Sequence, residues 1–333
     1  MNIYITLLFT TTTTFSITIS LISTTPLIPI LAITLTSLAF LNLLNTSNKT
    51  TPLLTSNAQA KYLLIQLTSF CMLYPLIPLS LQPNANSLTT NTLLILGTLI
   101  PLTIWPNHIY AIELIRATSP TIILIFLTIQ KIIPLHLISL PINSLPTTLI
   151  PLLITAALLS DLTAINQTNL LKLLSLSSSS QLAWLIIAYP LAPKLIKINF
   201  IIYTVITITI INSIKQLKTP HTKQLLITPP KNPLSLTIAI LSLSGIPPFL
   251  GAFIKLSILT LYTKTSSIII SLTLSLIALA SIYLYVHIAL LFLEKTTPKL
   301  FSENPNNNPK QINIPLIINS LSLPIAPLTT QNI

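Results

Sequence analysis

Charged residues are scarce in this chain of 333 residues: they make up 6% of it, whereas hydrophobic residues make up 52%. A soluble domain usually carries about a quarter charged residues, because its surface must face water. Intrinsic disorder is excluded as well, since it requires low hydrophobicity and high net charge. The composition therefore predicts one transmembrane domain over residues 1–333, with no soluble domain.

Residue types that serve redox or nucleotide chemistry are also scarce. The single cysteine, Cys71, can form neither an internal disulfide nor the thiolate cluster of an iron–sulfur centre. None of the three glycines belongs to a phosphate-binding loop, and the histidines and carboxylates lack metal-ligand spacing. We therefore expect the chain to bind no NADH, flavin, iron–sulfur cluster or metal ion by itself.

Acidic residues number four, against sixteen lysines and arginines, which gives a formal charge of +12. The basic residues are scattered between apolar runs. Phosphate recognition needs basic residues clustered on a hydrated face, so nucleic acid is not an expected partner. The expected surroundings are instead the lipid bilayer and other membrane proteins.

Apolar runs of spanning length repeat along the chain, separated by Pro, Asn or Lys. A spanning helix needs roughly 20 residues. The first run has no basic segment before it and no cleavage site after it, so it predicts a span and not a signal peptide. An all-α polytopic fold with about eleven transmembrane helices is predicted, at residues 3–23, 26–44, 62–81, 91–107, 118–140, 146–165, 170–190, 198–214, 234–254, 266–292 and 312–328.

Lys131 lies near the middle of the predicted span 118–140. A charge at the centre of a spanning helix costs at least ~2.5–3.5 kcal/mol, so such a residue is a functional candidate. Pro134 should loosen the helix and free carbonyl groups for water or for the lysine. A buried lysine gives up its proton more readily, as a reversible proton carrier must. The alternative is a lysine whose amine extends to the membrane interface.

Lys255 follows a run that is broken in its middle by Gly245, Pro247, Pro248 and Gly251. Unwound backbone is tolerated at membrane depth only beside protein or water, and it is typical of ion-transport sites. The pattern predicts a broken helix that presents Lys255 to such a site. The alternative is a helix end with an interfacial lysine.

Three further ionisable groups are candidates for proton transfer. Glu113 stands three residues before Arg116, which also fits a helical ion pair, and His108 precedes both. Asp161 lies inside an apolar run, as a buried carboxylate or as a charge at a helix end.

Five segments, spread over most of the chain in the right order, resemble the chain 2 family of NADH–ubiquinone oxidoreductase. This family is a mitochondrially encoded, antiporter-like membrane subunit of respiratory complex I. Residues 58–66, AQAKYLLIQ, resemble its A-x-x-K-Y-F-L-x-Q segment, and residues 241–255, LSLSGIPPFLGAFIK, resemble its L-S-L-G-G-L-P-P-L-x-G-F-x-x-K. The remaining three segments are residues 164–184, the pair Gln130-Lys131 and residues 281–287.

The resemblance implies two inverted repeats of five helices, each with a broken helix and a lysine near the middle of the membrane. It implies proton transfer along lysine, glutamate and histidine side chains, driven by redox chemistry in other subunits. Those subunits handle NADH, FMN, the iron–sulfur clusters and ubiquinone, so this chain would bind no small-molecule substrate directly. Lys131 and Lys255 fall on the family's central and distal lysines, and Lys61, Glu113 and His108 also match family positions. The implied location is the mitochondrial inner membrane, beside other membrane-arm subunits.

Two family positions are altered. The family's glutamate in G-L-E-M-N aligns with Thr34, and its lysine in M-K-L-G-M-A-P-F-H aligns with Pro101. Asp161 could supply a replacement carboxylate. The alternative is a structural membrane-arm subunit that has lost its own proton path. A free-standing cation/proton antiporter is disfavoured, because it would bind cations with carboxylates and the chain has four acidic residues.

The basic residues predict the orientation in the membrane. Numbering the loops by the predicted spans, eleven basic residues lie in loops after even-numbered spans and three in loops after odd-numbered spans. The positive-inside rule then places the N-terminus in the matrix and, with an odd number of spans, the C-terminus in the intermembrane space. An epitope at the C-terminus should be digested by protease in mitoplasts, whose outer face is the intermembrane-space face. Protection of that epitope would contradict the orientation.

Overall fold

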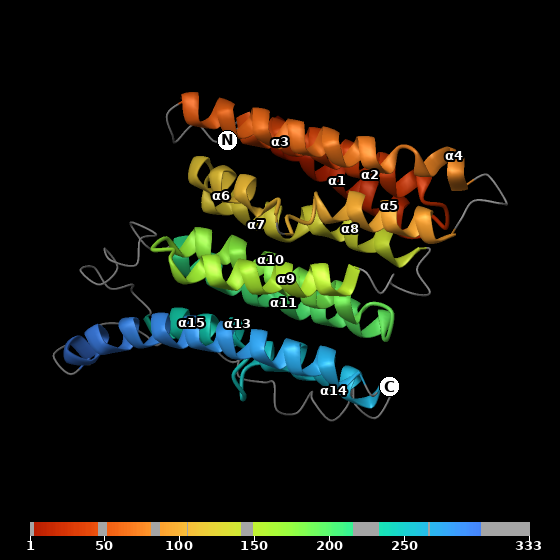
Figure 1. Ribbon diagram of the computed structural model, residues 1–333. Coiled ribbons are helices and arrows are strands. Elements are labelled where there is room, and N and C mark those ends of the chain that lie inside the picture. Colours follow the sequence, from red (N-terminus) through yellow and green to blue (C-terminus); the bar gives the residue numbers. More distant parts are fainter. Residues whose placement is uncertain are drawn as a thin grey trace. The chain divides into compact units, whose positions relative to one another are not determined.

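The computed structural model describes residues 3–45, 52–80, 87–104, 106–140, 149–215, 233–265 and 267–300. Nearly all of them lie in α-helices (Figure 1). Within these ranges, seven helical segments are long and apolar enough to span a membrane, and two shorter apolar helices lie at Thr90–Leu99 and Leu149–Ile165. The all-α polytopic prediction is confirmed. The expected run at 312–328 lies outside the described residues.

The chain divides into two compact units. Unit 1 comprises residues 1–157 and 178–190, and unit 2 comprises residues 158–177 and 191–333. The division passes through α9 (Leu149–Ile165) and α10 (Leu170–Ala188), so each of these helices contributes residues to both units.

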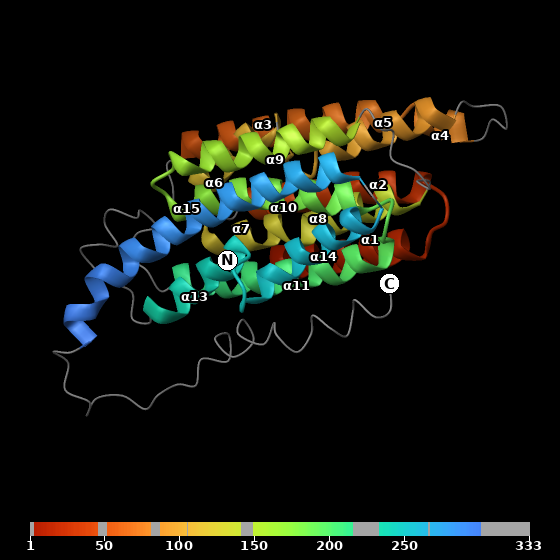
Figure 2. The same cartoon turned by 60° about the horizontal axis from the view of Figure 1, so that its bottom comes forward.

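Unit 1 is a bundle of helices that follow closely on one another in the sequence. Helix α1 packs along α2, α2 packs against α3 and α8, and α3 packs against α5 and α6 (Figures 1 and 2). Their bounds are α1 Ile3–Ile22, α2 Leu27–Asn45, α3 Pro52–Leu73, α4 Leu76–Ser80, α5 Ser87–Leu99, α6 His108–Ala117, α7 Pro120–Leu127 and α8 Ile129–Ser139.

Aromatic rings join four helices in the interior of unit 1. The ring of Phe40 lies 5.2 Å from that of Tyr62 and 5.8 Å from that of Phe126, and the rings of Tyr110 and Phe126 are 6.3 Å apart. Tilted and offset ring pairs at such distances are favourable beyond the area that they bury. These contacts fix α2, α3, α6 and α7 against one another around the position of Lys131.

The predicted span 91–107 is interrupted near its middle. Helix α5 ends at Leu99 and α6 begins at His108. Pro101 has no N–H to donate and disfavours a helical conformation at the residue before it, so the helix cannot continue through this point. The backbone turns tightly, and Thr103 takes the left-handed conformation with a φ of 62°. The continuous helix predicted over residues 91–107 is therefore replaced by a helix that ends at Leu99 and a break.

The span 118–140 is also divided, but not at the proline that the sequence suggested. Helix α7 ends at Leu127 and α8 begins at Ile129, and Pro134 stays inside α8. At Thr128 the backbone N–H and the side-chain hydroxyl both bond to the carbonyl of Leu124, at 3.0 and 2.8 Å. The interruption therefore precedes Pro134 by two turns of helix.

Unit 2 contains α11 (Pro193–Lys215), α13 (Pro233–Ser244), α14 (Leu250–Lys264) and α15 (Ile268–Leu300). Helices α13 and α14 both pack against α11 and α15. The predicted broken helix is confirmed, because residues 245–249 separate α13 from α14. Gly245 has a φ of 85°, and the Pro247–Pro248 bond is cis.

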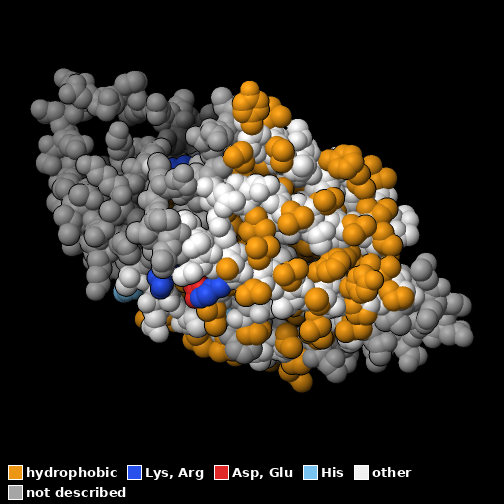
Figure 3. Space-filling model, turned by 90° about the horizontal axis from the view of Figure 1, so that it is seen from above, with side chains coloured by type: hydrophobic (Ala, Val, Ile, Leu, Met, Phe, Trp, Pro, Cys, Tyr) orange, Lys and Arg blue, Asp and Glu red, His pale blue; other side chains and the backbone are white. Residues whose placement is uncertain are grey.

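The described surface suits a lipid environment. Large apolar side chains are exposed on many helices, among them Tyr4, Phe15 and Ile269. In the view of Figure 3, apolar side chains cover much of the described surface, and charged atoms are few.

Gly251 is required for the close approach of α13 and α14. A Cβ atom at Gly251 would lie 1.6 Å from the backbone carbonyl oxygen of Ser242, whereas one at Gly97 would meet side-chain atoms of the buried Leu73, the nearest at 2.6 Å. Gly251→Ala should therefore destabilise the protein by about 1–3 kcal/mol through overpacking against backbone. Gly97→Ala is the matched control and should stay within about 1 kcal/mol, since alanine favours the helix. The melting temperatures of the two variants, purified in one detergent, would test this, and equal values would contradict it.

Candidate functional site

The amine of Lys131 is held inside unit 1. The residue is 0% exposed, and its Nζ donates to the carbonyl oxygen of Pro101 at 3.0 Å and to Oγ1 of Thr103 at 2.8 Å. Nζ also lies 4.9 Å from the centre of the Phe126 ring, a cation–π distance. The amine therefore does not extend to an interface, and its acceptors come from the break between α5 and α6, not from its own helix.

The amine of Lys255 is held in a similar way inside unit 2. The residue is 3% exposed, and its Nζ donates to the carbonyl oxygen of Ser244 at 2.7 Å and to the hydroxyl of Ser281. Ser244 is the last residue of α13, so this acceptor is a carbonyl at a helix end. A side chain at Gly245 would collide with Lys255, because a Cβ there would lie 2.7 Å from its Cδ.

Asp161 lies on α9, in the part that belongs to unit 2, and is 3% exposed. Of the two possibilities that the sequence left open, the buried carboxylate is the one observed. Unit 2 therefore combines a buried amine, a buried carboxylate and hydroxyl groups.

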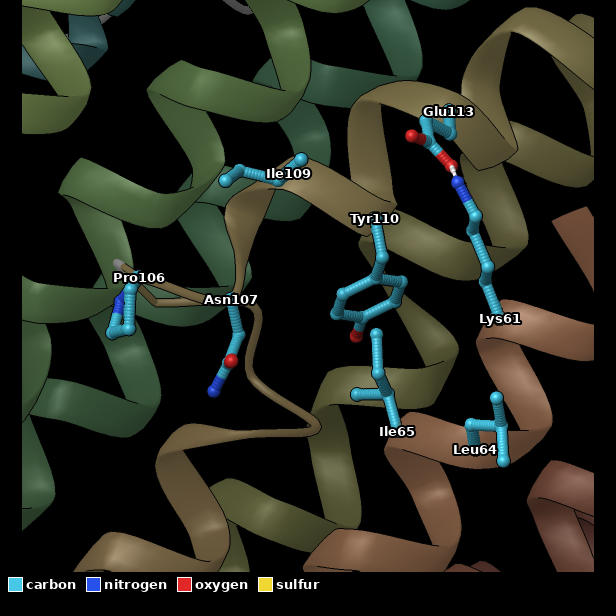
Figure 4. Close-up of a pocket in the computed structure, with 8 residues that line it drawn as sticks. All are labelled: Lys61, Leu64, Ile65, Pro106, Asn107, Ile109, Tyr110 and Glu113. Atoms are coloured by element: carbon cyan, nitrogen blue, oxygen red, sulfur yellow. Dashed lines mark hydrogen bonds and ion pairs between the residues drawn. The ribbon is translucent and has the colours of Figure 1, made fainter.

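Lys61 and Glu113 form an ion pair on unit 1. Lys61 Nζ lies 2.5 Å from Glu113 Oε2, and the two side chains are 52% and 37% exposed. The pair borders a cavity of about 360 Å³ that is otherwise lined by Leu64, Ile65, Pro106, Asn107, Ile109 and Tyr110 (Figure 4). The recorded partner of Glu113 is thus Lys61 on α3, not Arg116 on its own helix. Helices α3 and α6 supply the two charges.

His108 is the first residue of α6 and is 6% exposed. Among the described residues, its Nδ1 has no hydrogen-bond partner. Helix α6 therefore holds His108 next to the break, five residues before the pocket residue Glu113.

Thr34 and Pro101 stand where the resemblance to the family implies a glutamate and a lysine. The Thr34 hydroxyl donates to the carbonyl of Leu31 on its own helix, at 2.7 Å. Pro101 contributes a carbonyl oxygen to Lys131. The altered second position is therefore still part of the lysine site, but as a neutral acceptor.

The structure groups the candidates into two sets. Unit 1 holds Lys61, Glu113, His108 and Lys131, and unit 2 holds Lys255 and Asp161.

Sequence reasoning missed the acceptors of both amines: Pro101, Thr103, Ser244 and Ser281. Threonine and serine are common in every apolar run of this chain, so no sequence signal distinguished Thr103 or Ser281 from the rest. The one available signal was the proline at 101, which predicts a free carbonyl nearby.

Comparison with known proteins adds independent evidence. Residues 23–282 match the family model described as NADH:quinone oxidoreductase/Mrp antiporter, TM. The chain is 31% identical over 291 residues to NADH-ubiquinone oxidoreductase chain 2 of Sylvisorex ollula, covering 81% of this chain and 83% of that one. It is 32% identical to the chain 2 of Xenopus laevis, covering 67% and 68%, and 32% identical to that of Gallus gallus, of whose length it covers 60%.

Solved structures share the fold at lower identity. A chain of respiratory complex I from Thermus thermophilus with bound aureothin matches with a TM-score of 0.77 and 16% identity, covering 96% of this chain and 77% of that one. A chain of the Mrp complex from Dietzia sp. DQ12-45-1b matches with a TM-score of 0.71 and 15% identity, covering 83% and 58%. The antiporter-like fold expected from the sequence is therefore confirmed.

The Lys61–Glu113 pair should contribute little to stability. Exposed ion pairs are typically worth about 0–1 kcal/mol, because solvent screens them and two long side chains must be ordered. A double-mutant cycle of Lys61→Met and Glu113→Gln should give a coupling energy below about 1 kcal/mol. Thermal unfolding of the four proteins in one detergent measures it, with Arg116→Gln as the control for loss of an exposed charge on α6. A coupling energy above about 2 kcal/mol would make the pair a structural element.

Proposed function

This chain belongs to the NADH–ubiquinone oxidoreductase chain 2 family, and we propose that it is a core membrane-arm subunit of mitochondrial complex I. In this role it contributes to proton translocation coupled to electron transfer from NADH to ubiquinone, as part of a translocase. The observation that carries the proposal is the fully buried amine of Lys131, held by acceptors at a helix break. A buried ionisable group in a spanning helix is costly and marks an ion pathway.

Lys131 and Lys255 are the proposed proton carriers. An amine can accept and release one proton, and burial away from water makes its charged form more costly. Each amine has two acceptors in contact, which stabilise its charged form. Burial and the hydrogen bonds thus act in opposite directions on the charged form, and a carrier that must both take up and release a proton needs such a balance.

The other candidates have supporting roles in this proposal. Lys61 and Glu113 form a partly exposed pair at which protons can be exchanged, and His108 offers a buried ring nitrogen nearby in sequence. Asp161 is a buried carboxylate in the same unit as Lys255, which supports its role as a replacement carboxylate.

Redox chemistry belongs to other subunits in this proposal, which would handle NADH, FMN, the iron–sulfur clusters and ubiquinone. The partners of the chain are other membrane-arm subunits and the lipids of the mitochondrial inner membrane, with the N-terminus in the matrix and the C-terminus in the intermembrane space. Residues 1–333 act as one transmembrane domain.

A structural membrane-arm subunit without a proton path is the second candidate. It is favoured by Thr34, whose hydroxyl bonds only within its own helix, and by Pro101, which offers no titratable group. The buried amines of Lys131 and Lys255 weigh against it, since a scaffold has no use for two buried lysines.

Lys131→Met tests the two candidates directly. Methionine keeps the length and apolar bulk of lysine but cannot titrate, so the complex should assemble while NADH-driven proton pumping falls by about tenfold or more. Electron transfer should slow with it, because the two are coupled. Lys131→Arg should also impair pumping, since arginine does not release its proton. Pumping is measured as proton uptake by vesicles that contain the assembled complex, normalised to complex content.

Lys264→Met is the matched control, because Lys264 is the exposed last residue of α14. It should leave pumping unchanged. Normal pumping by Lys131→Met would instead support the structural subunit.

A further inference from the structure

Among the described residues, few ionisable groups pack against α8, the helix of Lys131; one of them, Tyr189, donates its hydroxyl to the carbonyl of Ser139 at the end of that helix. Helices α1, α2, α5 and α7 pack against α8 and carry one ionisable side chain among them, Tyr4, which is 88% exposed. On α8 itself the other ionisable residue is His136. The recorded contacts of the amine are a carbonyl, a hydroxyl and an aromatic ring. Neutral groups therefore hold a charge for which a carboxylate would be the usual partner.

The backbone of Thr103 is strained at this site. It is 1% exposed and has a φ of 62°, which a β-branched residue rarely adopts. Its hydroxyl donates to the carbonyl of Leu102 at 2.5 Å, so its lone pairs are left to accept from Lys131 at 2.8 Å. Glycine or asparagine would fit this conformation with less strain. A threonine in such a position indicates that the hydroxyl is needed there.

In unit 2 the amine of Lys255 also bonds to one carbonyl and one hydroxyl, but the order of the lysine and the hydroxyl along the chain is reversed. In unit 1 the break supplies the hydroxyl of Thr103, and the following span supplies the lysine. In unit 2 the broken helix supplies Lys255, and the following helix α15 supplies the hydroxyl of Ser281. Each amine also bonds one carbonyl at a break, that of Pro101 or of Ser244. A hydroxyl beside a free carbonyl thus recurs at both buried lysines.

We propose that Thr103 is a positioning residue for proton transfer, which holds the amine of Lys131 at the break between α5 and α6. This inference rests on the proposed function of Lys131 as a proton carrier. The Thr103 hydroxyl and the Pro101 carbonyl together fix where the ammonium group lies, and the strained turn at residue 103 presents both groups to it. Loss of the hydroxyl leaves the charged amine with one acceptor in a buried site.

Three substitutions at position 103 separate positioning from a structural role. Thr103→Val keeps the shape and the strain but removes the hydroxyl, so proton pumping per assembled complex should fall about tenfold. Thr103→Ser keeps the hydroxyl and should restore pumping to within about twofold of the original protein. Thr103→Gly relieves the strain, so the complex should assemble and melt at least as well, yet pump as poorly as Thr103→Val.

The matched control is Thr98→Val, because Thr98 is 0% exposed and its hydroxyl bonds to a carbonyl of its own helix, that of Ile95. This variant should pump within about twofold of the original protein. The measurement is NADH-driven proton uptake by vesicles containing the assembled complex, as for Lys131→Met.

If Thr103→Val or Thr103→Gly pumps as well as Thr98→Val while Lys131→Met is inactive, the positioning role is overturned and the proton-carrier role stands. If Lys131→Met pumps normally, the proposed function itself fails. Should Thr103→Val assemble poorly, Thr103→Gly decides the matter, since it removes the hydroxyl without the strain.

Discussion

A buried ammonium group must be surrounded by hydrogen-bond acceptors, and in this protein the acceptors are made by interrupting helices. Carbonyl groups inside a helix already accept a backbone N–H, whereas those at a helix end have no such partner and are free to accept from a side chain. The breaks after Leu99 and after Ser244 release carbonyls at Pro101 and Ser244, and the two buried lysines bond to them. The left-handed turns at Thr103 and Gly245 lie at these two breaks, and Gly251 allows the close helix contact beside the second one.

The two units use different residues to break a helix beside a buried lysine. Prolines and a left-handed threonine make the break in unit 1, whereas Gly245 and a Pro-Pro pair make it in unit 2. Gly251 lets α13 and α14 approach so closely that no side chain fits between them. In unit 1 the ring of Phe126 lies against the amine of Lys131, and the rings of Phe40 and Tyr62 pack behind it. The residues at the two breaks differ, but in both units a buried amine is bonded to one carbonyl and one hydroxyl.

The resemblance to the family implies a lysine at the position of Pro101, and proline supplies no titratable side chain there. The backbone carbonyl of Pro101 accepts a hydrogen bond from Lys131 but cannot take up its proton. Unit 2 contains a buried carboxylate, Asp161, as well as the buried amine of Lys255.

The sequence by itself determined the all-α polytopic fold, because apolar runs of spanning length can satisfy their backbone in a bilayer only as helices. It also predicted the broken helix before Lys255 and singled out Lys131 as a candidate, since Gly, Pro and Lys are rare in such runs, but it left open whether the amine of Lys131 is buried or reaches the interface. Only the tertiary structure decided that Lys131 bonds to the break at Pro101 and Thr103, that the predicted span 118–140 is divided at Thr128, and that Glu113 pairs with Lys61. These contacts join residues 28 to 52 positions apart, and the residue types involved recur throughout the chain. Their pairing depends on how the helices pack, which no local pattern specifies.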